Sequence, residues 1–172
     1  MQALLLSVSL AVILCYLWYA SLVKKRQSAI DSLIVLNQKI DARLVLLSQL
    51  SDVSLQHQPL DEAQADQWQQ LRALADNSLW SQGIDHHLPT TLAVWSEMDM
   101  LQKGLFSALH GDDLDEQRVN EYLQLELDYQ NVAEFYNQTV TELNQGVGMF
   151  PGSIVAKLAK VSVMPQLIPD VG

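Results

Sequence analysis

The sequence predicts an all-α protein: a single N-terminal transmembrane helix that continues into an antiparallel up-and-down four-helix bundle. Three observations lead to this prediction. The stretch from Ala3 to Val23 contains no charged residue. Apolar residues then recur at spacings of three and four along most of the chain, which is the period of an amphipathic helix. The 7 Gly and 5 Pro are clustered, so they leave room for long helices joined by short loops.

The apolar N-terminal stretch has the length of a membrane span, because about twenty helical residues cross a hydrocarbon core of about 30 Å. Its C-terminal end carries the aromatic and basic residues typical of a membrane interface, namely Tyr16, Trp18, Tyr19, Lys24, Lys25 and Arg26. The positive-inside rule then places the N-terminus outside and the bundle in the cytoplasm. A cleaved signal peptide or a leader lipidated at Cys15 is the alternative. Both are disfavoured, because the apolar core is long and no basic residue precedes it.

Small residues recur every four positions within this stretch, at Ala3, Ser7, Ala11 and Cys15. Such a ridge allows helix backbones to approach closely in lipid. We therefore expect a homo-oligomer whose anchors pack through this face.

The chain divides by composition into a membrane anchor (1–26), a helical bundle (27–148) and an apolar membrane-proximal tail (149–172). All 20 acidic residues but only 7 of the 10 basic ones follow the anchor, which gives that part a net charge of −13. This balance argues against nucleic acid as a partner. The single cysteine lies in the predicted span, which excludes a disulfide framework and a cysteine metal site.

The first bundle helix is predicted to run out of the span as far as Pro59. Its predicted seam is Ile30, Leu33, Asn37, Ile40, Leu44 and Leu47, widened by Leu36, Val45, Leu46 and Leu50. In this register Asn37 is the one polar seam residue. Asp61 and Gln64 then form a capping box for a second helix, from about Glu62 to Trp80.

A turn from Gly83 to Pro89 is predicted to precede the third helix, from about Thr91 to Leu109. A second capping box, Asp113 with Glu116, is predicted to open a fourth helix that ends near Gln145. Its seam is Tyr122, Glu126, Tyr129, Ala133, Tyr136, Val140, Leu143 and Val147. Glu126 is the only charge in that seam, and either fixes the register from a buried position or reaches the rim. A ligand-binding carboxylate is the functional alternative.

The fourth helix is expected to return the chain to the membrane side of the bundle. The tail from Gly152 to Met164 is apolar apart from Lys157 and Lys160, whose long side chains can reach headgroups. We expect this tail at the bilayer surface or against the first helix of a neighbouring subunit. A frayed terminus is the alternative.

The end of the fourth helix and the residues after it resemble the LemA family. The matching residues are Glu126, Tyr136, Asn137, Val140, Asn144, Phe150, Pro151, Ser153 and Ala156. The chain departs from the family pattern at Leu127 and Ala133, where the family usually has Asn and Arg. The resemblance implies a helical protein anchored in the bacterial inner membrane, and it implies no defined reaction.

The four histidines fall at predicted helix ends or loops, and no metal-binding helix motif is present. No catalytic residue, metal or cofactor is predicted. The predicted function is a self-assembling scaffold whose partners are the lipid bilayer, further copies of the chain and possibly other membrane proteins. The alternative is a small ligand-binding or sensory four-helix bundle that serves a membrane protein complex.

Overall fold

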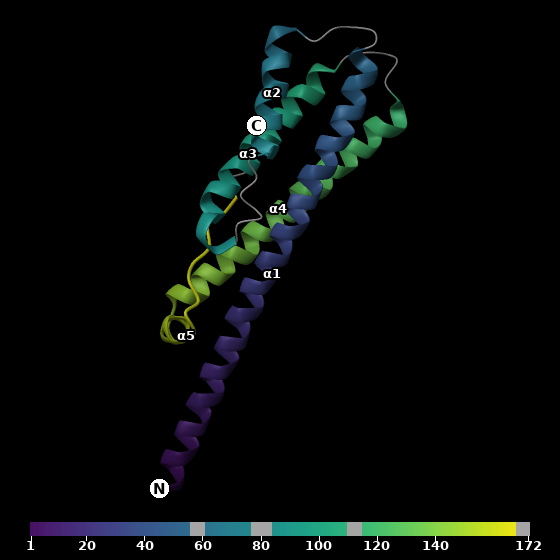
Figure 1. Cartoon of the computed structure of the whole chain (residues 1–172). Coiled ribbons are helices and arrows are strands. Elements are labelled where there is room, and N and C mark those ends of the chain that lie inside the picture. Colours follow the sequence, from purple (N-terminus) through teal and green to yellow (C-terminus); the bar gives the residue numbers. More distant parts are fainter. Residues whose placement is uncertain (56–60, 77–83, 110–114, 168–172) are drawn as a thin grey trace. The chain divides into compact units, whose positions relative to one another are not determined.

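The computed structural model describes residues 1–55, 61–76, 84–109 and 115–167 (Figure 1). These residues form helices and connecting segments, and no strand occurs among them, so the prediction of an all-helical chain is confirmed for this part. The helices are α1 (Gln2–Leu55), α2 (Glu62–Asp76), α3 (Ile84–Ala108), α4 (Glu116–Gly148) and α5 (Gly152–Ala159).

The helices belong to two compact units. The N-terminal unit contains Met1–Leu33 and Glu134–Gln166, and the central unit contains Ile34–Ala133 with the chain end from Leu167. Helices α1 and α4 each contribute residues to both units. The two units are described separately below.

The N-terminal part of α1 is long and apolar enough to cross a membrane, by length and composition. Its large apolar side chains from Leu5 to Leu17 are exposed. Beyond this part, one face of α1 becomes buried at heptad spacing: Leu22, Ala29, Leu33, Leu36, Ile40, Arg43, Leu47 and Leu50. An amphipathic helix that joins a domain is expected to change in this way.

The predicted seam of this helix was partly wrong. Leu33, Ile40 and Leu47 are buried as predicted, but Asn37 and Leu44 are only half-buried and Val45 is exposed. Leu36, Leu46 and Leu50, which were predicted to widen the seam, are also buried, and the charged residue on this buried side is Arg43, which was not predicted there. Asn37 forms a local hydrogen bond from its Nδ2 to Asp41 Oδ2 (3.1 Å).

The predicted capping box of α2 is confirmed. The backbone N–H of Gln64 donates to Asp61 Oδ1 (2.7 Å), and the backbone N–H of Asp61 donates to Gln64 Oε1 (3.1 Å). Helix α2 packs along α3 in the central unit and buries Trp68 and Leu71. It is described as far as Asp76, so the predicted end near Trp80 lies outside the described residues.

The predicted turn before α3 was wrong for the residues that the structure describes. Helix α3 begins at Ile84 and contains Pro89. Proline removes the backbone bond to the residue four positions earlier, but the surrounding backbone remains helical here. His87 is exposed on this first part of the helix. His57 and His110 lie outside the described residues, as does the side chain of His86.

Helix α4 keeps the predicted seam. Tyr122, Tyr129, Ala133, Tyr136, Val140 and Leu143 are buried, whereas Glu126 and Val147 are half-buried. The residue that caps the helix is Asp115, whose Oδ1 accepts a hydrogen bond from the backbone N–H of Gln117 (3.0 Å). The predicted cap Asp113 lies outside the described residues. Asp115 can cap the helix because it directly precedes the first helical residue.

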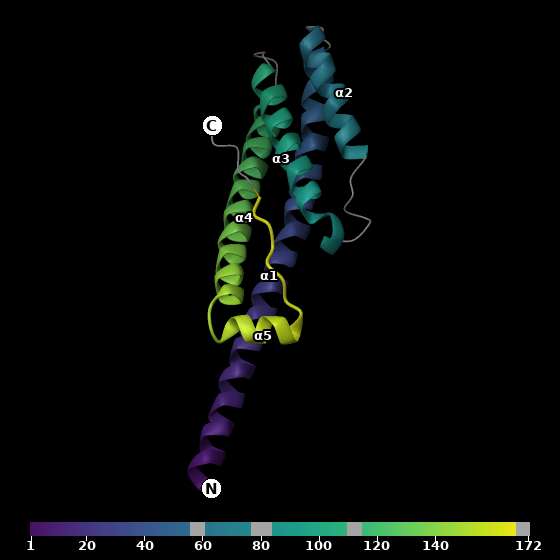
Figure 2. The same cartoon turned by 90° about the vertical axis from the view of Figure 1, so that its left-hand side faces the viewer.

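Helix α5 lies across α1 in the N-terminal unit rather than along it (Figure 2). Close approach of backbone depends on two glycines. A Cβ at Gly146 would lie 2.9 Å from Leu22 Cδ2, and one at Gly152 would lie 3.0 Å from Trp18 Cε3 and would clash with the carbonyl oxygen of Gly146. Glycine at both positions therefore allows the corner between α4 and α5 to pack against α1.

Candidate functional site

The most unusual feature of the central unit is the buried guanidinium of Arg43. Its side chain is 0 % exposed, although the chain carries only ten basic residues and an excess of acidic ones. Arg43 lies between Ile40 and Leu47 on the buried stripe of α1, at spacings of three and four. The helical period therefore directs this charge inward, and its position requires an anionic partner.

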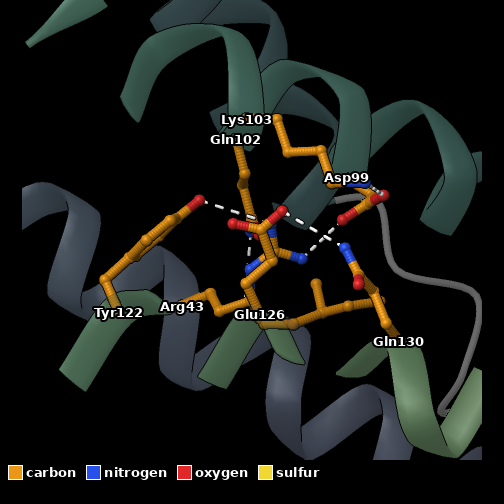
Figure 3. A network of polar contacts seen from close by, with 8 residues as sticks. Arg43, Asp99, Gln102, Lys103, Tyr122, Glu126 and Gln130 are labelled. Carbon is orange, nitrogen blue, oxygen red and sulfur yellow. Dashed lines mark hydrogen bonds and ion pairs between the residues drawn. The ribbon is translucent and has the colours of Figure 1, made fainter. Parts of the chain in front are cut away.

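That partner is Asp99 of α3 (Figure 3). Arg43 Nη1 lies 2.5 Å from Asp99 Oδ1, and Lys103 Nζ lies 2.9 Å from Asp99 Oδ2. One buried carboxylate is thus shared between two cations. Arg43 Nη2 also donates to the hydroxyl of Tyr122 on α4 (3.3 Å), so the guanidinium joins α1, α3 and α4 within this unit.

Aromatic rings enclose the guanidinium. Arg43 Cζ lies 5.4 Å from the ring centroid of Tyr122 and 5.3 Å from that of Tyr129. The ring of Phe106 stacks on Tyr122 with a centroid separation of 4.1 Å. Cation–π attraction grows when water is excluded, so these rings stabilise the buried charge in addition to the ion pair.

The protonation states follow from this environment. Burial alone would lower the pKa of Arg43, but Tyr122 and Asp99 raise it above its ordinary value. Burial raises the pKa of Tyr122 even though the Arg43 charge opposes this, and burial together with Asp99 raises the pKa of Tyr129. Both phenols therefore remain protonated at neutral pH. Tyr122 accepts a hydrogen bond here, and the ring of Tyr129 packs against the guanidinium.

Two buried polar atoms beside the ion pair have no hydrogen-bond partner in the described part of the chain. They are Arg43 Nε and Gln102 Oε1. The amide nitrogen of Gln102 is used, because it donates to the backbone carbonyl of Ile40 (3.2 Å). An unpaired buried polar atom costs about 1–3 kcal/mol, so this cluster fixes how the helices pack more than it adds net stability.

Glu126 lies at the edge of this network. Its side chain is half-buried, and Oε1 accepts a hydrogen bond from Gln130 Nε2 (3.4 Å). Figure 3 shows it on α4 between Tyr122 and Gln130. The carboxylate contributes to raising the pKa of Tyr122.

Apart from Glu126, the residues on which the predicted family resemblance rests lie in the N-terminal unit, near the corner between α4 and α5. The Tyr136 hydroxyl donates to the carbonyl of Pro165 (2.7 Å). Asn144 bonds both backbone groups of Met164: its Nδ2 donates to the carbonyl (2.8 Å), and its Oδ1 accepts from the N–H (2.9 Å). These bonds hold the segment after α5 along α4.

The remaining motif residues belong to the same corner. Val140 and Ala156 are buried, Pro151 precedes the first residue of α5, Asn137 and Ser153 are half-buried, and Phe150 is 80 % exposed. These residues therefore form the turn between α4 and α5, and two of them bind the segment that follows α5. Glu126 belongs to the other unit and takes no part in this turn.

Of the aromatic and basic residues predicted at the membrane interface, some are exposed and some pack against the rest of the N-terminal unit. Tyr16, Tyr19 and Lys24 are exposed, whereas Trp18, Lys25 and Arg26 are half-buried. Trp18 meets Gly152, and Lys25 Nζ pairs with Glu142 Oε2 of α4 (2.8 Å). On the predicted oligomer face, Ser7, Ala11 and Cys15 are exposed, and the side chain of Ala3 lies outside the described ones.

Within the described residues, no group of three or more His, Cys, Asp or Glu side chains is placed to hold a metal ion. Comparisons with protein-family models, with curated proteins and with solved structures give no match for this chain.

The sequence analysis did not identify Arg43, Asp99 and Gln102 as a site. A signal was present, because Trp95, Asp99 and Gln102 follow spacings of four and three, as do Ile40, Arg43 and Leu47. Polar residues at seam positions of two different helices are the expected mark of a buried pair.

Proposed function

We propose that this chain is a divergent LemA-like protein that acts as a membrane-anchored, self-assembling helical scaffold. In this proposal α1 spans the bacterial inner membrane with its N-terminus outside. The helices from α1 to α4 form an antiparallel up-and-down four-helix bundle on the cytoplasmic side. The chain performs no catalysis of its own and presents its bundle and span to partners.

The main support is the character of α1. It is one helix of 54 residues whose apolar side chains are exposed near the N-terminus and whose buried stripe begins at Leu22. Exposed large apolar residues over several turns are unfavourable in water and favourable in lipid. A helix of this kind attaches a folded domain to a bilayer, which is the task of a membrane scaffold.

The interior of the central unit also supports this assignment. Its buried ion pair is enclosed by aromatic rings, and its phenols have raised pKa values. This arrangement resists proton transfer and holds three helices together. In this proposal two of the residues that resemble the LemA family have a structural role, because Tyr136 and Asn144 bond the segment after α5.

The test is the assembled mass of the full chain in mild detergent, measured by native mass spectrometry. We expect an oligomer of one defined size. Ser7→Leu combined with Ala11→Leu should lower the assembled fraction, because it fills the small-residue face of the span. The matched control is Ser9→Leu combined with Ala20→Leu, which makes the same two changes on the opposite face of α1.

A monomer under all these conditions would contradict self-assembly. An oligomer that both double variants leave unchanged would show that other surfaces hold the subunits together.

A further inference from the structure

Helix α5 carries large apolar side chains on its outward side as well as apolar residues on its buried side. Gly152, Val155 and Ala156 form the buried face. Ile154 and Leu158 lie one helical turn apart on the opposite side and are 52 % and 82 % exposed. Phe150, which lies in the turn just before the helix, is 80 % exposed. Nothing in the described part of the N-terminal unit covers this face, and large contiguous apolar faces mark binding surfaces.

The place where α5 meets α1 indicates what covers the face. Gly152 contacts Trp18, and the neighbouring Gly146 contacts Leu22. Both contacts fall before Val23, the last residue of the uncharged stretch. Trp18 lies five residues before Val23, which corresponds to about 8 Å along a helix. An interfacial helix lies with its apolar face about 5–10 Å into the headgroup and acyl boundary.

The length of the span also requires Trp18 to lie within the bilayer. From Ala3 to Leu17 the helix covers about 22 Å, which is less than the hydrocarbon thickness of about 30 Å. A complete crossing therefore needs the residues up to Val23 within the bilayer. Because α5 contacts α1 at Trp18, the same insertion brings α5 into the interface.

Direction and charge fit a helix that lies on a membrane. Figure 2 shows α5 crosswise to α1, so α5 runs along the plane of a bilayer that α1 crosses. Lys157 and Lys160 are exposed, and their side chains can reach outward to lipid phosphates. No acidic residue occurs between Leu143 and Leu167, although the chain as a whole is acidic. This part of the chain is thus suited to an anionic lipid surface.

We infer that α5 is a second membrane contact, an interfacial helix whose outward residues Ile154 and Leu158, together with Phe150 just before the helix, enter the bilayer beside the end of the α1 span. The inference rests on the proposed crossing of α1 and adds a site on the chain that binds lipid. Two attachments in different directions would also fix the tilt and rotation of the anchor, which a single span leaves open.

The test measures the surroundings of single spin labels on the full chain. The chain carries Cys15→Ser and one further change, Ile154→Cys or Leu158→Cys, and is reconstituted in vesicles of phosphatidylethanolamine and phosphatidylglycerol. Two reference positions are exposed in the structure: Leu10→Cys in the span and Leu127→Cys on α4 in the central unit. The readout is collision with oxygen, which concentrates in lipid, and with a water-soluble nickel chelate.

We expect the labels at 154 and 158 to collide with oxygen severalfold more than with nickel, as the label at 10 should, and the label at 127 to show the reverse. Nickel access at 154 and 158 equal to that at 127 would overturn the inference, because the face would then lie in water. Protection from both reagents would overturn it as well, because a second copy of the chain would then cover the face. Nickel access at position 10 would instead reject the crossing of α1.

Discussion

Arg43 and Asp99 form a buried ion pair, and removing one of the two residues should destabilise the protein more than removing both. Loss of one partner leaves a charge without its counter-ion in a poorly solvated place, whereas loss of both leaves only a packing defect. Lys103 reduces the first effect, because it remains beside Asp99. We therefore expect the double substitution to be less destabilising than the loss of Arg43 alone.

Arg43→Met is expected to lower the free energy of unfolding by about 3 kcal/mol, measured by urea unfolding of the full chain in mild detergent with helical circular dichroism as the signal. Adding Asp99→Leu should restore a large part of this loss. The control is Lys39→Met, which removes a partly exposed pair with Asp128 (2.6 Å) and should cost much less, because solvent screens this pair. Equal effects of Arg43→Met and Lys39→Met would contradict the assigned role of the buried pair.

Protonation of Glu142 should make the N-terminal unit less stable at low pH. The hydrogen bond and charge of Lys25 hold the pKa of Glu142 below its ordinary value of 4.5. A depressed folded-state pKa means that the stabilisation is present above the unfolded-state pKa and is lost as the pH falls through the folded-state value. We expect a carboxyl titration by nuclear magnetic resonance to show a pKa below 4.5, and Lys25→Gln to raise it. A titration that Lys25→Gln leaves unchanged would show that the pair does not form in solution.

At the scale of the helices, the number of long helices and their approximate extents follow from the sequence, and so does the seam of α4. The register of α1 was only partly predicted. The spacing of apolar residues predicts Asn37 and Leu44 in the seam, yet both are half-buried and Arg43 is fully buried. Its burial depends on Asp99, which lies 56 residues away. Local periodicity contains no information about such a partner, so the site could not be assembled from one helix alone.

The corner between α4 and α5 depends on glycine at position 152. Gly152→Ala should displace α5 from α1, because the added methyl group would overlap the carbonyl oxygen of Gly146. The expected result is at least tenfold faster hydrogen exchange at the backbone N–H of Met164, which Asn144 holds in the native corner. Gly104→Ala is the matched control, since a Cβ there meets nothing within 4 Å.

The control should leave this exchange unchanged and stabilise α3 by up to about 1 kcal/mol, because alanine favours a helix. Unchanged exchange in Gly152→Ala would show that α5 is not held in this position.

For the whole molecule, the orientation in the membrane is set by Lys24, Lys25 and Arg26 in our proposal. In a Cys15→Ser background, Glu121→Cys places a thiol at an exposed position on α4. We expect a membrane-impermeant maleimide to label it only after the cells are lysed. Labelling in intact cells would place the domain outside. Replacing all three basic residues with Gln should increase the fraction that is labelled in intact cells.

The N-terminal unit joins the first 33 residues to residues 134–166, so the whole of Ile34–Ala133 is made before its second half exists. At a synthesis rate of about 5–20 residues per second, the 100 residues between the two halves take about 5–20 s. During that time Leu22 lacks its neighbour Gly146, and Lys25 lacks its ion-pair partner Glu142. The nascent chain therefore passes through a stage in which the N-terminal half of this unit has been made but its C-terminal half has not, and any factor that protects exposed apolar surface has those seconds in which to act.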